Sequence, residues 1–141
     1  MVVSAIITNK GEVLVGKKEE KENHPVSGEW IFPGGHLDDE EDIEEALKRE
    51  VKEETDLAVD VHQLIDCYSK SYSSGRNSMV RIFYHCESSK EEAKAEDDLS
   101  EVKWVSPDSL EETLGDTDHS TLENRPTISN FIKKIEKMPG L

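Results

Sequence analysis

Residues 35–57 constrain this chain more than any other stretch, because a strongly helical segment carries acidic side chains in an unusual arrangement. Asp42 is a good N-cap, and Glu45 stands three residues later as its capping-box partner. Residues 43–54 contain neither glycine nor proline, and most of them favour helices. The sequence therefore predicts an amphipathic helix that follows Asp42.

Three glutamates of this helix fall on or beside its apolar face. At about 100° per residue, Glu50 and Glu54 lie within the apolar arc and Glu53 lies at its edge, so the three are neighbours on the helix surface. The last helical turn disfavours anions by roughly 0.3–1 kcal/mol each. A divalent cation bound by the carboxylate oxygens would remove that cost. The alternative is a solvated acidic helix, but solvation alone would not favour the apolar arc. This arc is formed by Ile43, Ala46, Leu47 and Val51.

Residues 35–57 resemble the signature of the Nudix hydrolases, the MutT-like pyrophosphohydrolases. This signature is called the Nudix box. The family pattern is Gly, five residues, Glu, seven residues, Arg-Glu, an aliphatic residue, any residue, Glu-Glu, any residue, Gly and an aliphatic residue. Asp56 stands where the family has its second Gly, at a position that follows the helix and requires a left-handed conformation, which Asp tolerates. Glu40 also stands where many relatives carry Gly. The matching positions are Gly35, Glu41, Arg49, Glu50, Val51, Glu53, Glu54 and Leu57.

The resemblance implies a metal-dependent attack of water on a diphosphate linkage. It makes Glu50, Glu53 and Glu54 the expected metal ligands, with the backbone carbonyl of Gly34 as a further ligand. Mg²⁺ suits carboxylate and phosphate oxygens, and Mn²⁺ is the alternative ion. Either Glu53 or Glu54 is also expected to orient or deprotonate the attacking water.

Arg49 and Glu41 are expected to form a supporting pair, with Arg49 also holding Glu53 in place. A simple helix-stabilising role for Arg49 is as well supported as a direct role in substrate binding. Some relatives take a general base from the loop before the Trp-containing strand, and Asp98 and Glu96 are the first candidates for it here. Each of these acidic residues is also explained as a solvated surface charge.

Four residues are candidates for substrate binding. Lys17, or its neighbour Lys18, ends a predicted strand where relatives often have a basic residue that meets phosphate. Gly35 lets the backbone approach a ligand closely, and the adjacent His36 could reach a phosphate, although a role in loop packing explains it better. Trp30 is expected chiefly to pack against the core, with substrate contact as the second reading.

Composition limits the partners. A net charge of −15 and a pI near 4.7 disfavour nucleic-acid polymers and anionic membranes, and a polyphosphate substrate would need metal ions to offset the repulsion. The apolar run at residues 2–7 is too short for a signal peptide or a membrane span, so we expect a cytoplasmic protein.

The five histidines show no spacing typical of zinc sites. Cys67 and Cys86 are expected to be buried free thiols.

The order of predicted elements indicates one domain, residues 1–141, of the α/β class with a mixed sheet between helices. This agrees with the α/β/α sandwich that the Nudix resemblance implies. Loops are expected at residues 19–28, 69–77 and 90–101, with irregular structure at residues 115–124. The expected strands cover residues 2–8, 12–18, 58–67, 78–87 and 100–105, and the expected helices cover residues 43–54, 108–114 and 126–137.

The function expected from the resemblance is hydrolysis of a nucleoside triphosphate to the monophosphate and pyrophosphate. An ADP-ribose or ADP-sugar pyrophosphatase is the alternative, although relatives with that activity often have a proline soon after the box, and none occurs here between Pro33 and Pro107. A non-catalytic nucleotide sensor is the alternative of a different class, but such domains typically lose box glutamates. A homodimer is expected only by analogy with relatives.

Overall fold

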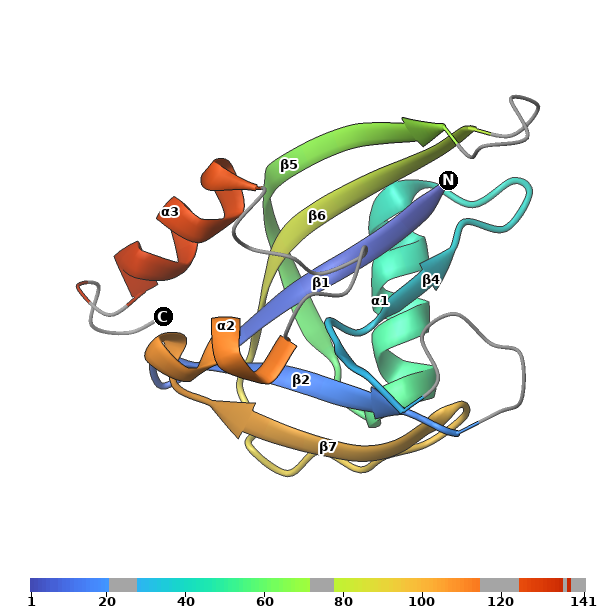
Figure 1. The fold of residues 1–141 in the computed structure, drawn as a ribbon. Coiled ribbons are helices and arrows are strands. Elements are labelled where there is room, and N and C mark those ends of the chain that lie inside the picture. The colour runs from blue at the N-terminus through green and yellow to red at the C-terminus, as the bar shows by residue number, and fades with distance from the viewer. Residues whose placement is uncertain (21–27, 72–77, 115–124, 136, 138–141) are drawn as a thin grey trace.

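The computed structural model describes residues 1–20, 28–71, 78–114, 125–135 and 137, and within them a mixed sheet lies between helices (Figure 1). This arrangement confirms the predicted fold class. The strands are β1 (Val2–Asn9), β2 (Glu12–Lys18), β3 (Trp30–Ile31), β4 (Gly34–His36), β5 (Val59–Ser71), β6 (Ser78–Ser88) and β7 (Leu99–Val105). The helices are α1 (Ile43–Thr55), α2 (Pro107–Leu114) and α3 (Pro126–Ile135).

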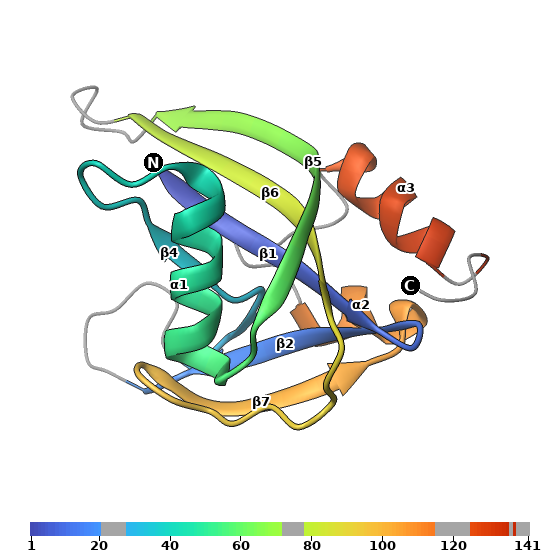
Figure 2. The same cartoon turned by 180° about the vertical axis from the view of Figure 1, so that it is seen from behind.

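The strands are ordered β3-β2-β1-β6-β5, with β4 added beside β1 and β7 beside β2. β1 and β6 run parallel, and the other pairs are antiparallel. β1 contacts β2 only near the hairpin, where Thr8 pairs with Val13, and then pairs with β4, where Ser4 is opposite Gly34. β2 and β1 therefore diverge, and β4 enters the sheet next to the start of β1 (Figure 2).

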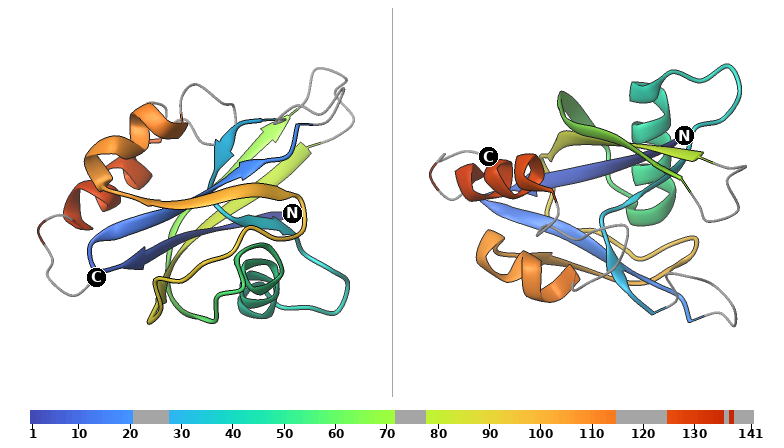
Figure 3. Two further views of the ribbon diagram at one scale, coloured as in Figure 1. Left: turned by 90° about the horizontal axis from the view of Figure 1, so that it is seen from below. Right: turned by 45° about the horizontal axis from the view of Figure 1, so that its top comes forward.

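Successive side chains of a strand point to opposite faces of the sheet, and this alternation creates two hydrophobic cores. Val3, Ala5 and Ile7 of β1 pack toward α1, whereas Ile6 packs toward α2 and α3. In β2, Leu14 faces α1, and its neighbours on either side face the other helices. Figure 3 shows α2 and α3 together on the side of the sheet away from α1.

Helix α1 follows its predicted signals. Asp42 is the N-cap, and its side chain accepts a hydrogen bond of 2.8 Å from the backbone N–H of Glu45. Asp56 ends the helix in the left-handed conformation, with φ 61° and ψ 19°, and its N–H donates to the carbonyl of Lys52. Glu40 also has a positive φ, of 67°, so both residues that replace family glycines adopt glycine-like backbone conformations.

Strand β5 differs from the prediction in length and in exposure. It continues to Ser71, beyond the predicted end at residue 67, and residues 72–77 of the predicted loop lie outside the described residues. Two bulges shift its alternation, which leaves Leu64 and Cys67 exposed. The prediction of a buried Cys67 is therefore wrong, whereas Cys86 is buried and both thiols are free.

The other differences are small. β4 was not predicted, because three residues that begin with two glycines carry no strand signal. β7 begins at Leu99 and α3 ends at Ile135. Residues 115–124 and most of the loop at residues 19–28 are outside the described part of the chain. None of the described helices is long and apolar enough to cross a membrane.

Candidate active site

A buried carboxyl group, that of Glu54 in the last turn of α1, lies at the centre of the candidate site. Glu54 is 1% exposed, and its Oε1 accepts a hydrogen bond of 2.8 Å from the backbone N–H of Gly34 in β4. Its Oε2 lies 3.7 Å from the Nζ of Lys18. Burial raises the pKa of Glu54 to about 8, although Lys18 and the Gly34 N–H both favour the ionised form. The ionised carboxylate therefore needs more positive charge than the described protein groups supply.

The two glycines of β4 allow the strand backbone to approach these carboxyl groups. A Cβ atom on Gly34 would collide with the carbonyl oxygen of Val3 in β1. A Cβ on Gly35 would lie 2.5 Å from the carboxyl carbon of Glu50. Glycine is therefore required at position 34 for close packing of β4 against the backbone of β1, whereas a side chain at position 35 would displace the carboxyl group of Glu50.

Glu50 and Glu53 differ in their surroundings. The side chain of Glu50 is 13% exposed, and burial raises its pKa although Arg49 opposes the effect. The side chain of Glu53 is 49% exposed and lies 3.3 Å from Arg49. Of the three glutamates expected to bind metal, Glu50 and Glu54 are thus partly or fully withdrawn from water, and Glu53 lies at the surface.

Arg49 links the helix to the loop before it. Its Nε and one terminal nitrogen donate hydrogen bonds of 2.7 and 2.9 Å to the two carboxylate oxygens of Glu41. The same guanidinium donates to the carbonyl of His36 and to Glu50, both at 3.1 Å. The hydrogen bond from Arg49 lowers the pKa of Glu41. The structure thus brings the predicted pair together, with Arg49 also beside Glu53.

A loop from a distant part of the sequence closes the end of α1. The N–H groups of Lys94 and Glu96 donate to the carbonyls of Thr55 and Glu54, each at 2.9 Å. These bonds satisfy carbonyls that the end of a helix leaves without partners. The carbonyl of Asp98 accepts a bond of 2.9 Å from the N–H of Glu19, so the loop is attached to both α1 and the end of β2.

This attachment brings Asp98 beside Glu54. Burial opposes ionisation of Asp98, but the hydrogen bond from Lys18 favours the ionised form, and the pKa of Asp98 is lowered. The Nζ of Lys18 donates to Asp98 Oδ2 at 2.5 Å. The second oxygen, Oδ1, is buried and has no hydrogen-bond partner among the described residues. Asp98 therefore has one oxygen, Oδ2, bonded to Lys18 and a second, Oδ1, that can accept a further bond.

These residues fit a hard divalent ion. The donors are carboxylate oxygens of Glu50 and Glu54, to which those of Glu53 and the Gly34 carbonyl can be added, and such oxygen donors suit magnesium or manganese. The unpartnered Asp98 Oδ1 and the raised pKa of Glu54 both indicate a need for positive charge. Within the described residues, no three His, Cys, Asp or Glu side chains converge into a ready-made ion site. Water and substrate oxygens would complete the coordination, as magnesium commonly requires.

Comparison with known proteins agrees with this geometry. The model of the NUDIX domain family matches residues 1–125, which include α1, β4 and the loop with Asp98. The chain belongs to the Nudix family. It is accordingly a hydrolase that acts on pyrophosphate bonds, in a family that takes small nucleotide substrates and generally uses divalent metal ions.

Individual Nudix relatives are distant. The nucleoside triphosphatase NudI of Escherichia coli O139:H28 is 29% identical over 118 residues, which are 77% of this chain and 83% of NudI. The MutT protein of Methanosarcina mazei Go1 superposes with a TM-score of 0.71 at 22% identity, over 96% of this chain and 91% of that one. A C. elegans Ap4A hydrolase has a TM-score of 0.66 at 16% identity, over 97% and 96% of the two chains. These two structures establish the shared fold.

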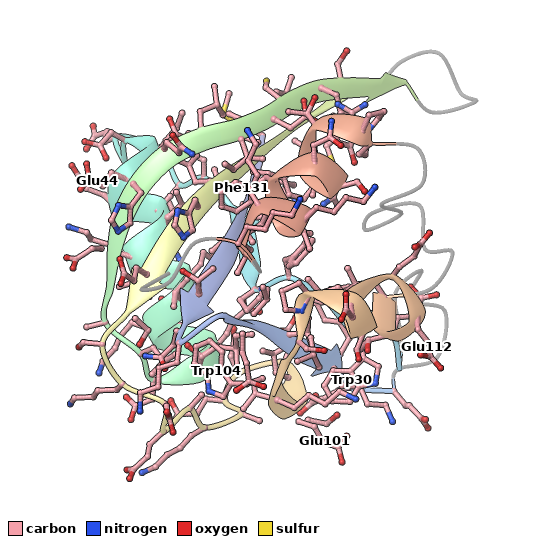
Figure 4. All side chains as sticks on the ribbon, turned by 90° about the vertical axis from the view of Figure 1, so that its left-hand side faces the viewer. Trp30, Glu44, Glu101, Trp104, Glu112 and Phe131 are labelled. Carbon is pink, nitrogen blue, oxygen red and sulfur yellow. The ribbon has the colours of Figure 1, made fainter. Side chains whose placement is uncertain are left out.

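Other residues predicted for the Nudix site lie farther from Glu54 or contribute backbone only. Glu96 is exposed and joins the site through its N–H. His36 is also exposed, and its carbonyl binds Arg49. Trp30 packs against the core on the α2 side of the sheet, and the Nζ of Lys103 lies 4.3 Å from its ring centroid (Figure 4).

The two candidate lysines separate onto opposite faces. Lys17 pairs with Trp30 across β2 and β3, and directly paired residues share a face, so Lys17 lies on the α2 side. Lys18 instead contacts Glu54 and Asp98 on the α1 side. Lys17 is the lysine predicted from the sequence to bind substrate. Side chains alternate along a strand, so Lys18, four residues after Leu14, is expected on the same face as Leu14. This alternation is the signal that could have selected Lys18 for the acidic side.

Proposed function

We propose that this Nudix hydrolase converts nucleoside triphosphates to the nucleoside monophosphate and pyrophosphate with Mg²⁺ as its metal. The observation that carries the proposal is the buried Glu54, which a Nudix box places between the Gly34 N–H, Lys18 and Asp98. The similarity to a protein named as a nucleoside triphosphatase supports the substrate class. The all-oxygen donor set suits magnesium, and manganese is the alternative ion.

The metal would be held by Glu50, Glu53 and Glu54, with the Gly34 carbonyl as a further ligand. A bound divalent ion supplies charge neutralisation and Lewis-acid polarisation of a phosphoryl oxygen. The guanidinium of Arg49 keeps Glu50 and Glu53 oriented, and Glu41 fixes that guanidinium through two hydrogen bonds.

Asp98 is proposed as the group that receives the proton of the attacking water, because its Oδ1 is unpartnered and lies within the acidic site. The water oxygen forms a bond to the α or the β phosphorus, and the bond from that phosphorus to the oxygen that bridges the α and β phosphorus atoms breaks. Pyrophosphate and nucleoside monophosphate result from attack at either position. Lys17, Trp30, Gly35 and His36 remain proposals for contacts with the rest of the substrate.

The experiment is a measurement of turnover over a nucleotide panel with Mg²⁺, with product identification by chromatography. The panel contains ordinary and oxidised nucleoside triphosphates, ADP-ribose, an ADP-sugar and dinucleoside polyphosphates. Glu54→Gln is run beside Glu44→Gln, which changes an exposed glutamate of the same helix that pairs with Lys48 at 3.3 Å.

We expect triphosphates to give pyrophosphate, EDTA to abolish turnover, and only Glu54→Gln to lose activity. Preferred hydrolysis of ADP-ribose would replace the substrate assignment. Nucleotide binding without turnover on any compound would refute the assignment of catalysis and favour a sensor.

A further inference from the structure

Lys18 is an unusual lysine, because its ammonium group is withdrawn from water into the acidic site. Its side chain is 17% exposed, and Nζ lies 2.5 Å from Asp98 Oδ2 and 3.7 Å from Glu54 Oε2. Lysine ammonium groups rarely leave water unless they are paired with acidic groups. Here the pairing is with two carboxylates that come from different parts of the chain.

The backbone fixes Lys18 in this position. Its N–H donates to the carbonyl of Glu29 at 2.9 Å, and its carbonyl accepts from the N–H of Gly28 at 3.1 Å. On the same face of β2, Gly16 leaves room for Leu99, since a Cβ on Gly16 would lie 2.6 Å from a methyl carbon of that leucine. Leu99 directly follows Asp98, so this packing also helps to position the carboxylate that Lys18 binds.

The charges in this cluster do not balance in the described protein. Lys18 contributes one positive charge beside two acidic groups, and Glu50 adds a third acidic group a turn away on α1. A divalent ion would bring the group of three carboxylates and one ammonium to neutrality. The ion and the ammonium would then both lie beside the carboxylate of Glu54, and like charges at such distances repel strongly where water is excluded.

We propose that Lys18 is a built-in counter-cation that keeps Glu54 and Asp98 together in the metal-free protein and thereby weakens the affinity of the acidic site for the divalent ion. The inference rests on the proposed function, because it requires an ion at Glu54. Lys18 acts here as a positioning residue, since it orients Asp98 before the ion arrives.

The test is the dissociation constant of Mg²⁺, measured by titration calorimetry on the whole chain. Lys18→Met and Lys18→Gln remove the charge, the second with a polar group that can still bond to Asp98. Lys18→Arg keeps the charge. Lys17→Met is the matched control, because it makes the same change one residue earlier on the opposite face of β2. The titrations are run at about pH 8.5, where protons compete less with the ion for raised-pKa carboxylates.

We expect both neutral variants to bind Mg²⁺ about tenfold more tightly or better, because a repelling charge next to the ion is lost. Lys18→Arg and Lys17→Met should bind as the wild type does. Unchanged or weaker binding in the neutral variants would overturn the inference, as would an equal change in Lys18→Arg. If the wild type binds no Mg²⁺ and hydrolyses no nucleotide, the proposed function itself fails, so the two failures are distinguishable.

Discussion

The two faces of the sheet each bury a titratable group, and the surroundings of these groups differ. On the face of α2 and α3, His85 is 3% exposed, contacts the hydroxyl of Thr8 at 2.8 Å and packs against His62 and Phe131. Burial lowers the pKa of His85 to about 4, so the ring is neutral and has a neutral partner. On the face of α1, Glu54 is equally buried but lies among charged groups.

This difference separates a structural polar group from a functional one. His85 has satisfied contacts, and its removal would leave a cavity and would remove the shorter of two hydrogen bonds made by the Thr8 hydroxyl. Glu54 has a raised pKa and a neighbour, Asp98, with an unpartnered oxygen. We therefore expect substitutions at His85 to affect stability and substitutions at Glu54 or Asp98 to affect activity.

The largest effect is expected for Asp98→Asn, which should lower kcat by about 100-fold or more, because the amide cannot accept a proton from water. Asp97→Asn is the matched control, since Asp97 is exposed and its positive φ of 56° is tolerated by Asn. Steady-state kinetics with Mg²⁺ and a nucleoside triphosphate provides the measurement. Equal rates for the two variants would exclude Asp98 as the base.

On the opposite face, His85→Ala should lower the free energy of unfolding by about 2–3 kcal/mol through the lost packing and hydrogen bond. Urea denaturation measures this change, and kcat per folded molecule should remain near that of the wild type. His62→Ala, at the more exposed ring of the stacked pair, should cost less than about 1 kcal/mol. A larger loss for His62 than for His85 would contradict the account of this face.

The same histidine predicts a pH dependence. The pKa of His85 falls from 6.5 to about 4 on folding, so the unfolded chain binds the proton first as the pH decreases. Its contribution to stability is therefore complete above about pH 6.5 and is lost progressively toward pH 4, by up to about 3 kcal/mol. The difference in unfolding free energy between wild type and His85→Gln should shrink over this window, and a constant difference would show that the ring does not titrate in this way.

The smallest effect concerns the end of α1. Asp56→Gly should change stability by no more than about 1 kcal/mol in the stabilising direction, since glycine adopts the left-handed conformation without strain. Loss of the exposed 3.0 Å ion pair with Lys52 offsets part of this gain. Asp56→Ala loses the same ion pair without that relief and should be less stable than Asp56→Gly in urea denaturation.

Local rules were sufficient for much of the fold and for the acidic helix. Asp42, the apolar arc and the position of Asp56 specify α1, because caps and helical periodicity depend on neighbouring residues. The Arg49–Glu41 pair lies within one short motif, so it could also be predicted from the sequence. The bulges of β5 depend on pairing with β6, which explains why the exposure of Cys67 was missed.

The parts of the site that depend on distant segments were harder to predict. Asp98 was one of several acidic residues in its loop until backbone bonds to α1 and β2 placed it beside Glu54. Lys17 and Lys18 are equivalent by composition, and only strand pairing shows which of them faces α1. Tertiary contacts across the sheet, not local propensity, decide these assignments.

The central claim is that Glu54 is buried for ion binding at a cost to the metal-free protein. The most direct test is the free energy of unfolding of wild type and Glu54→Gln, each measured by urea denaturation with and without Mg²⁺ at about pH 8.5. Because the pKa of Glu54 is raised on folding, the contribution of Glu54 to the stability of the metal-free wild type falls as the pH rises from 4.5 through about 8, and Glu54→Gln lacks this one contribution to the pH dependence.

We predict that Glu54→Gln without Mg²⁺ is at least as stable as the wild type and gains much less than the wild type from the ion. A variant that is strongly destabilised, and that Mg²⁺ stabilises as much as it does the wild type, would contradict the claim.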